Sequence, residues 1–321
     1  CNQPVSGRKW LRGVFVATPE DFTRRFVHKD RGYRRGIIAM KSSSTIFVIA
    51  RLTFREASRR WVLWAALALG VLFLAIYAIG FYEINKDIQR TMGIESQVVG
   101  KEMQNFLIIM GLYVVNFLTL IMTVLTSVDT LSGEIASGTI HTLVSKPVQR
   151  SEILLGKWSG FTVMLTLYLL LMAGGVCFIG YLMADYLPEN VVRGVVLLWL
   201  NIPLMLGVSL VGGARLSTLA NGVVAFGLYG VAFIGGWIEQ VGSFVENQVA
   251  VNIGILCSLI IPSEAMWRRA AFEMQTPLSG ILGFSPFTSS SVPSPLMVVY
   301  AIFYALCTLF LATRSFQRRD L

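Results

Sequence analysis

The chain has 321 residues, of which 55% are apolar and only 14% are charged, and its mean hydropathy is +0.65. Soluble domains carry about a quarter charged residues, so this composition excludes an ordinary soluble protein and predicts a polytopic membrane protein. The net charge of +9 is typical of membrane-protein loops that face an anionic leaflet, and we expect no nucleic-acid partner.

The first 39 residues differ from the rest, because they contain no Met and sustain no apolar periodicity. Arg34-Arg35-Gly36 can be encoded as AGG-AGG-GGA, a purine-rich ribosome-binding sequence, a few codons before Met40. We therefore expect residues 1–39 to be a non-native or disordered leader and exclude them from the fold. N-terminal sequencing of the natural protein would test this expectation.

Residues 40–60 alternate between an apolar and a basic face at helical spacing. The apolar face carries Ile46, Ala50, Thr53, Ala57 and Trp61. The opposite face carries Arg51, Arg55 and Arg59. This pattern predicts an amphipathic helix that lies along the membrane interface. The alternative is a plain basic flank that sets the topology.

Six apolar stretches are long enough to cross a bilayer, which needs roughly 20 residues per helix. They are Trp61–Phe81, Phe106–Val128, Phe161–Met183, Gly194–Val211, Leu219–Ile238 and Leu296–Ala312. Pro203 and Gly207 interrupt the fourth, which makes its limits the least certain. A seventh stretch, Val251–Pro262, is too short to span and predicts a re-entrant or interfacial segment before the last span.

Lys and Arg are distributed unevenly between the two sides that these spans define. With the N-terminus inside, twelve Lys and Arg from Met40 onward fall on the cytoplasmic side and six on the other. Because positively charged loops remain in the cytoplasm, we expect a multi-pass plasma-membrane protein with both termini cytoplasmic. Segment 129–157 then lies inside the cell, and segment 239–295 lies outside.

The predicted spans offer few polar groups for chemistry. No Asp, Glu, Lys, Arg or His occurs in the first, second, third, fifth and sixth stretches, which argues against an ion-driven carrier. Candidates for lining a substrate path are Tyr113, Asn116, Tyr168 and Asn201. Interhelical hydrogen bonding explains the asparagines equally well.

The chain lacks the usual motifs for catalysis and nucleotide binding. It contains no GxxxxGK[ST] phosphate loop, and its only histidines are His28 and His141. We therefore expect no catalytic, metal or cofactor site in this chain, and any ATP to be bound by a partner.

The polar stretch between the second and third spans has a helical pattern of its own. Ile140, Leu143 and Val144 share one face of a short helix, while Ser137, His141 and Ser145 face elsewhere. Pro147 ends this helix, and a second helix begins near Ser151 and runs into the third span. Such an apolar face can dock in a groove of a soluble partner; the alternative is a solvated loop that carries topology-setting charges.

The string LSGEIASGTIHTLVSKPVQRSEILLGKW resembles the cytoplasmic loop of ABC transporter permeases of the type-2 exporter class. The matching positions are Glu134, Gly138, Thr139, Leu143, Lys146, Pro147, Arg150, Gly156 and Lys157, and Ile140 stands where Leu is common. The six-span layout with its amphipathic entry helix extends the resemblance from about Met40 to the end of the chain.

The resemblance implies an all-α integral membrane fold of six transmembrane helices. It implies that the loop is a cytoplasmic coupling helix, and that the permease pairs with a second permease, identical or different, and with cytoplasmic ATP-binding subunits. It also implies extracellular half-helices within Val251–Met274, with Trp267, Arg268 and Arg269 at the outer membrane surface.

Together these observations predict the membrane subunit of an ATP-driven exporter. The alternative is a membrane subunit that does not transport and uses the same ATPase movement for mechanical or scaffolding work.

Overall fold

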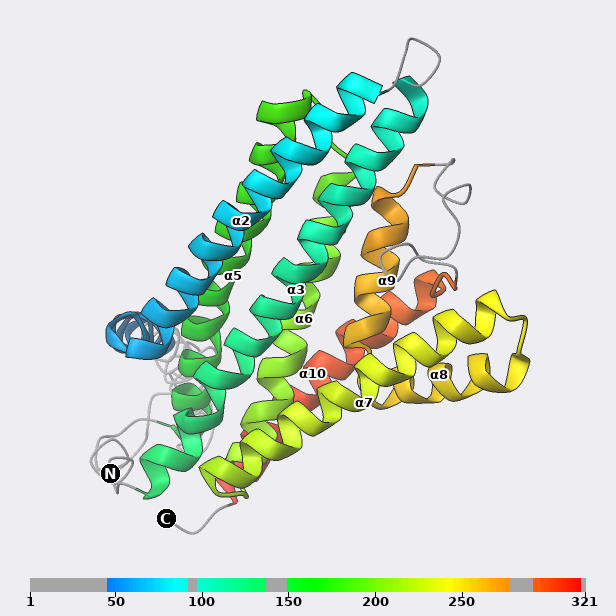
Figure 1. Cartoon of the computed structure of the whole chain (residues 1–321). Coiled ribbons are helices and arrows are strands. Elements are labelled where there is room, and N and C mark those ends of the chain that lie inside the picture. Colours follow the sequence, from blue (N-terminus) through cyan, green and yellow to red (C-terminus); the bar gives the residue numbers. More distant parts are fainter. Residues whose placement is uncertain (1–44, 92–96, 137–148, 277–290, 319–321) are drawn as a thin grey trace, which may run out of the picture. The chain divides into compact units, whose positions relative to one another are not determined.

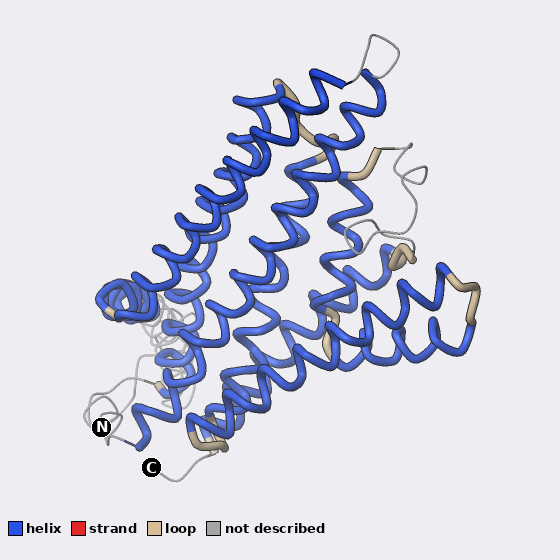
Figure 2. The backbone as a smooth tube through the Cα atoms, in the orientation of Figure 1, coloured by secondary structure: helices blue, strands red, loops and turns tan. Residues whose placement is uncertain are grey.

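The computed structural model describes residues 45–91, 97–136, 149–276 and 291–318, and helix is the only regular secondary structure in these ranges (Figures 1 and 2). The chain divides into two compact units, residues 1–45 and 46–321, and the helices named below belong to the second. The predicted leader, residues 1–39, lies outside the described residues.

Six helices are long and apolar enough to cross a membrane. They are α2 (Trp61–Thr91), α3 (Gln97–Ala136), α5 (Arg150–Ala184), α6 (Val191–Gly213), α7 (Thr218–Phe244) and α10 (Pro295–Gln317). Each contains one of the six predicted stretches, so the all-α membrane fold with six candidate spans is confirmed. The fourth continues through Pro203, as membrane helices tolerate proline where neighbouring groups satisfy the freed backbone.

Two shorter helices precede α10. They are α8 (Gln248–Ile260) and α9 (Ser263–Met274), and the axis bends by 110° between them at Ile261-Pro262. If the bent pair is counted as one span, the described residues contain seven candidate spans. The bend lies where the sequence places Val251–Pro262, the stretch too short to cross alone.

The α7–α8 connection is a tight reversal that lays α8 back along α7 (Figure 1). Glu246 adopts a left-handed backbone conformation with φ 57°. The side-chain oxygen of Asn247 then caps α8 by accepting hydrogen bonds from the backbone N–H groups of Val249 at 3.0 Å and Ala250 at 3.2 Å. Glu246 and Asn247 thus form the turn after which α8 runs back along α7.

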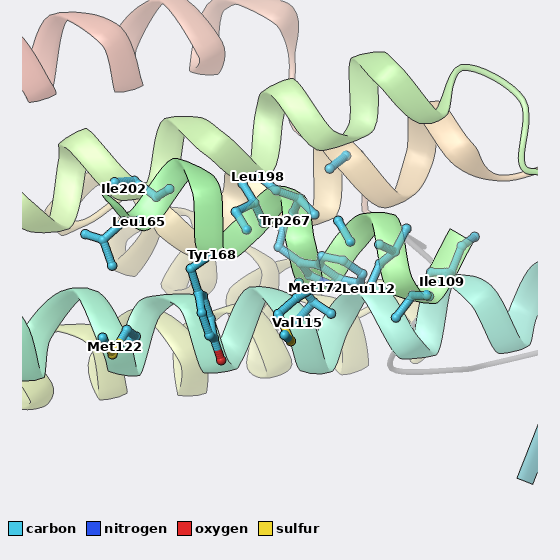
Figure 3. Packing of buried hydrophobic residues seen from close by; sticks show 14 of the residues in the cluster. Ile109, Leu112, Val115, Met122, Leu165, Tyr168, Met172, Leu198, Ile202 and Trp267 are labelled. Carbon is cyan, nitrogen blue, oxygen red and sulfur yellow. The ribbon is translucent and has the colours of Figure 1, made fainter. Parts of the chain in front are cut away.

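The apolar core is built around α3, α5 and α6, with α9 inserted against them (Figure 3). Leu112 on α3 and Met172 on α5 are fully buried, as is Leu198 on α6, and they pack with Trp267 of α9. By contrast, α2 and α10 bury few of their apolar side chains, as expected of helices that face lipid.

Residues 45–59 form a helix before α2. Thr53 and Ala57 are buried, while the three predicted basic-face arginines, Arg51, Arg55 and Arg59, are exposed. Trp61 differs from the prediction, because it begins α2 and is 83% exposed instead of completing the apolar face.

Contacts between helix termini define two ends of the bundle. At one end, which we call the loop end, the ends of α3, α6 and α10 lie beside the starts of α2, α5 and α7. At the other end, which we call the hairpin end, Asn85 of α2 donates to the carbonyl of Met183 on α5 at 2.8 Å. The α7–α8–α9 hairpin belongs to this second end.

Candidate functional site

Two of the eight predicted coupling residues, Glu134 and Arg150, lie at the loop end. Arg150 is the first residue of α5, and Glu134 lies in the last turn of α3. The other six, Gly138, Thr139, Ile140, Leu143, Lys146 and Pro147, lie outside the described residues. The structure therefore fixes the two helices between which the predicted loop runs.

The start of α5 lies one residue before the predicted position. The backbone N–H of Gln149 donates to the Glu152 carboxylate at 3.3 Å, so Gln149, and not Ser151, is the capping position. Glu152 also places a negative charge in the first turn, where the helix dipole favours it. The guanidinium of Arg150 donates to the carbonyl of Gln317 at 3.5 Å, which links this start to the end of α10.

The end of α3 and the start of α5 are joined by a buried polar contact. The Nζ of Lys157 donates to the backbone carbonyl of Thr130 at 3.3 Å, and the lysine side chain is buried. The hydroxyls of Ser132 on α3 and Thr218 on α7 lie 3.0 Å apart. A displacement of the segment between α3 and α5 would therefore act on both helices, and through Thr218 on α7.

Two glycines of α5 allow the helix at 45–59 to approach closely. A Cβ atom on Gly160 would lie 2.7 Å from the carbonyl oxygen of Ala50. A Cβ on Gly156 would lie 2.6 Å from the Cβ of Ile49. Gly156 belongs to the Leu-x-Gly-Lys ending of the loop pattern. Its missing side chain lets the helix at 45–59 pack against the start of α5, which explains the glycine in the pattern by packing.

The residues proposed for a substrate path do not gather in one place. Asn201 on α6 donates to the side-chain oxygen of Asn116 on α3 at 3.0 Å, and both side chains are buried. Tyr113 packs on Trp267, with ring centroids 4.9 Å apart. Tyr168 points its hydroxyl toward α2, where it donates to the carbonyl of Ala66 at 3.4 Å. The asparagines thus make the interhelical hydrogen bond that was the alternative to a path, and a path through these residues stays a prediction.

A buried ion pair that was not predicted from the sequence lies at the hairpin end. Arg268 of α9 donates to the Glu239 carboxylate of α7 at 2.7 Å, and the two side chains are only 1% and 4% exposed. The same guanidinium donates to Ser258 of α8 at 3.2 Å, and Ser291 donates to Glu239 at 2.7 Å. One ion pair therefore connects α7, α8 and α9.

The expected outer-surface position of Trp267 and Arg268 is wrong. Both are 1% exposed, because the bend before α9 turns Trp267 onto Tyr113 and Arg268 onto Glu239. Only Arg269 is partly exposed, and it pairs with Glu273 one turn later at 2.7 Å. The signal in the sequence was Glu239, the first charged residue after a predicted span that ended at Ile238.

A cavity of about 460 Å³ opens beside this ion pair. Its polar wall includes Glu239, Ser258 and Arg268, and its apolar wall includes Leu259 and Met297. Within the described ranges, no three His, Cys, Asp or Glu side chains gather to hold a metal ion. The carboxylate of Glu239 is committed to Arg268 and Ser291, which suits a structural charge better than a ligand-binding one.

Comparison with known families identifies a match over most of the chain. The family model described as ABC-2 family transporter protein matches residues 47–321. The matched region includes all six candidate spans, the bent pair α8–α9 and the segment between α3 and α5. No curated protein matches the chain.

Proposed function

The chain belongs to the ABC-2 transporter family, and from that premise we propose that it is the permease subunit of an ATP-driven exporter. Membership of the family makes it a multi-pass membrane subunit of an ABC transporter, a class whose permeases act with ATP-binding subunits. The coupling of ATP hydrolysis to this chain and the export direction are the proposal.

The observation that carries the proposal is the joining of α3 and α5 at the loop end. The α5 helix is unbroken over 35 residues from Arg150 to Ala184, which corresponds to about 50 Å. Lys157 holds it to Thr130 of α3. ATP binding would close the ATP-binding subunits, the segment between these helices would move with them, and both helices would transmit the displacement into the core.

We propose that the ATPase lies wholly on the partner subunits. The sequence offers no phosphate loop, so this chain would act without catalytic residues or a bound cofactor. A second permease, identical or different, would complete the membrane part. The Lys and Arg bias supports a plasma-membrane location with both termini and the coupling segment in the cytoplasm.

A second candidate function is mechanical work without transport. The observation that favours it is the arrangement of the polar interior, where Asn116 and Asn201 bind each other and Tyr168 turns toward α2. Such side chains hold helices together and do not present a common lining. In this case the same ATPase movement would reach α3 and α5 and act on a partner outside the membrane.

The experiment that tests the proposal is co-purification of the tagged chain with an ATP-binding subunit of the same organism. We expect a stable complex that hydrolyses ATP and, in inside-out vesicles, accumulates a fluorescent amphiphile only when ATP is present. Hydrolysis without accumulation of any amphiphile tested would favour the mechanical alternative. Failure of any ATP-binding subunit to associate would contradict both functions.

A further inference from the structure

Arginines from three elements gather around the end of α10. Arg314 belongs to its last turn, Arg318 is the capping residue that follows it, and Arg215 follows α6. The Nε of Arg215 donates to the hydroxyl of Ser315 at 3.1 Å, which holds this arginine against α10. Arg150 at the start of α5 reaches the same helix end. Three membrane helices thus deliver positive charge to one position.

Two cavities flank this helix end, one on each side of α10. The first, of about 690 Å³, is lined by Ala214, Arg215, Leu311, Arg314, Ser315 and Arg318. The second, of about 570 Å³, has Ser151, Leu155, Phe310 and Thr313 in its wall. Arg314 and Arg318 line both. The two arginines therefore form a basic ridge between two hollows, and we call this region the arginine grooves.

The charge in the arginine grooves is not neutralised by the described part of the protein. Arg60, Arg193, Arg268 and Arg269 each lie within 4.0 Å of a carboxylate. Among the described residues, no such ion pair involves Arg215, Arg314 or Arg318. Arg314 also lies in the last turn of α10, where it complements the helix dipole, but one cation suffices for that role.

The apolar wall of the grooves continues along the exposed side of α10. Leu306 and Phe310 are each 61% exposed, and Leu311 is 52% exposed. Phe310 and Leu311 lie about one turn before Arg314. A molecule bound here would meet cations at its polar end and apolar side chains along its length.

We propose that the arginine grooves bind the phosphate group of an anionic phospholipid, with its acyl chains along Leu306, Phe310 and Leu311. A free phosphate would leave the apolar wall uncovered, and a zwitterionic headgroup would bring its own cation against the arginines. Basic pockets at the ends of membrane helices are known to hold anionic headgroups. The inference holds whether or not the chain is coupled to an ATPase.

The bound lipid would join α5, α6 and α10 at the end where coupling begins. Its phosphate would neutralise Arg314 and Arg318 at the end of α10 and Arg215 after α6, so their mutual repulsion would fall on binding. The lipid therefore acts as a structural ligand of the loop end, and we expect anionic lipid to raise the thermal unfolding temperature of the chain.

The test uses the full-length chain, stripped of lipid in detergent and titrated with phosphatidylglycerol, with binding measured by native mass spectrometry. R314Q/R318Q should bind about thirtyfold more weakly, because it removes two basic residues and each contributes about fivefold to binding near an anionic lipid surface. The matched control is R90Q/K101Q, which removes the same charge from two exposed basic residues that line neither groove and lie outside the predicted interfacial helix. The control should bind like the unaltered chain, and R314K/R318K should keep most of the affinity.

Four results would overturn the proposal. The first is that R314Q/R318Q binds phosphatidylglycerol as tightly as the unaltered chain does, and the second is that the unaltered chain binds phosphatidylcholine as tightly as phosphatidylglycerol. The third is that inorganic phosphate displaces the bound lipid at equal concentration. The fourth is that R314Q/R318Q no longer binds an ATP-binding subunit although its lipid binding is unchanged. The last would assign the grooves to an acidic protein segment. Because the arginines are exposed, the double variant should fold, and its unfolding temperature without lipid should match that of the control.

Discussion

The charged side chains at the two ends of the bundle differ in burial and in pairing. At the hairpin end, Glu239 and Arg268 are buried, bound to each other and surrounded by hydroxyl groups. At the loop end, Arg60 and Asp129 lie 3.5 Å apart with 30% and 51% of their side chains exposed. The arginines of α10 have no carboxylate partner among the described residues.

The difference follows from what each end must do. A buried ion pair recovers its desolvation cost only when its geometry is fixed, so it holds α7, α8 and α9 in one arrangement. Exposed charges contribute little to stability and stay available to lipid and protein partners. We infer that the hairpin end is a rigid unit and that the loop end is the surface where partners act.

The largest expected effect comes from removing one member of the buried pair. Arg268→Met leaves the Glu239 carboxylate buried without its cation, which should cost about 3–5 kcal/mol. Thermal unfolding in detergent would measure this loss. The adjacent Arg269→Met removes a partly exposed arginine and should cost less than about 1 kcal/mol. Equal losses for the two variants would contradict the rigid hairpin end.

A smaller loss of stability is expected from a substitution where the helix at 45–59 packs on α5. Gly160→Val brings a Cβ to 2.7 Å from the carbonyl oxygen of Ala50, and overpacking of this kind costs about 1–3 kcal/mol. The matched control is Gly174→Val in the same helix, because a Cβ there meets nothing within 4 Å. If both variants unfold at the same temperature, helix 45–59 does not pack on α5 as described.

The spans could be predicted from the sequence because apolar length is a local property. Each predicted stretch fell inside one helix, although α3 runs on through the polar residues to Ala136. The partner of Glu239 could not be predicted in the same way, because Arg268 lies 29 residues later and reaches it only through the bend at Ile261-Pro262. The role of Gly156 likewise becomes visible only when Ile49 lies against it.

Removing a polar contact in the middle of the bundle should destabilise the protein less than removing the ion pair at the hairpin end. A double-mutant cycle with Asn116→Leu and Asn201→Leu should give a coupling energy of about 0.6–1.7 kcal/mol, the range measured for interhelical hydrogen bonds in membranes. Unfolding temperatures of the two single variants and the double variant supply the cycle. A coupling energy near zero would mean that the two side chains act separately, as residues of a path could.

The smallest effect is expected at the exposed pair of the loop end. Arg60→Gln removes the contacts with Asp129 and with Glu56, and it should change stability by less than about 1 kcal/mol. High salt should remove even that difference, because exposed pairs are screened. A loss as large as that of Arg268→Met would erase the contrast between the two ends.

We propose that the segment between α3 and α5 docks on an ATP-binding subunit through Ile140 and Leu143. The most direct measurement is the affinity of that subunit for the I140D/L143D variant, compared with S137D/S145D, which adds the same charge on the other side of the predicted helix. We expect I140D/L143D to bind at least about tenfold more weakly while inserting normally, and S137D/S145D to bind like the unaltered chain. Equal affinities for all three proteins would contradict the claim.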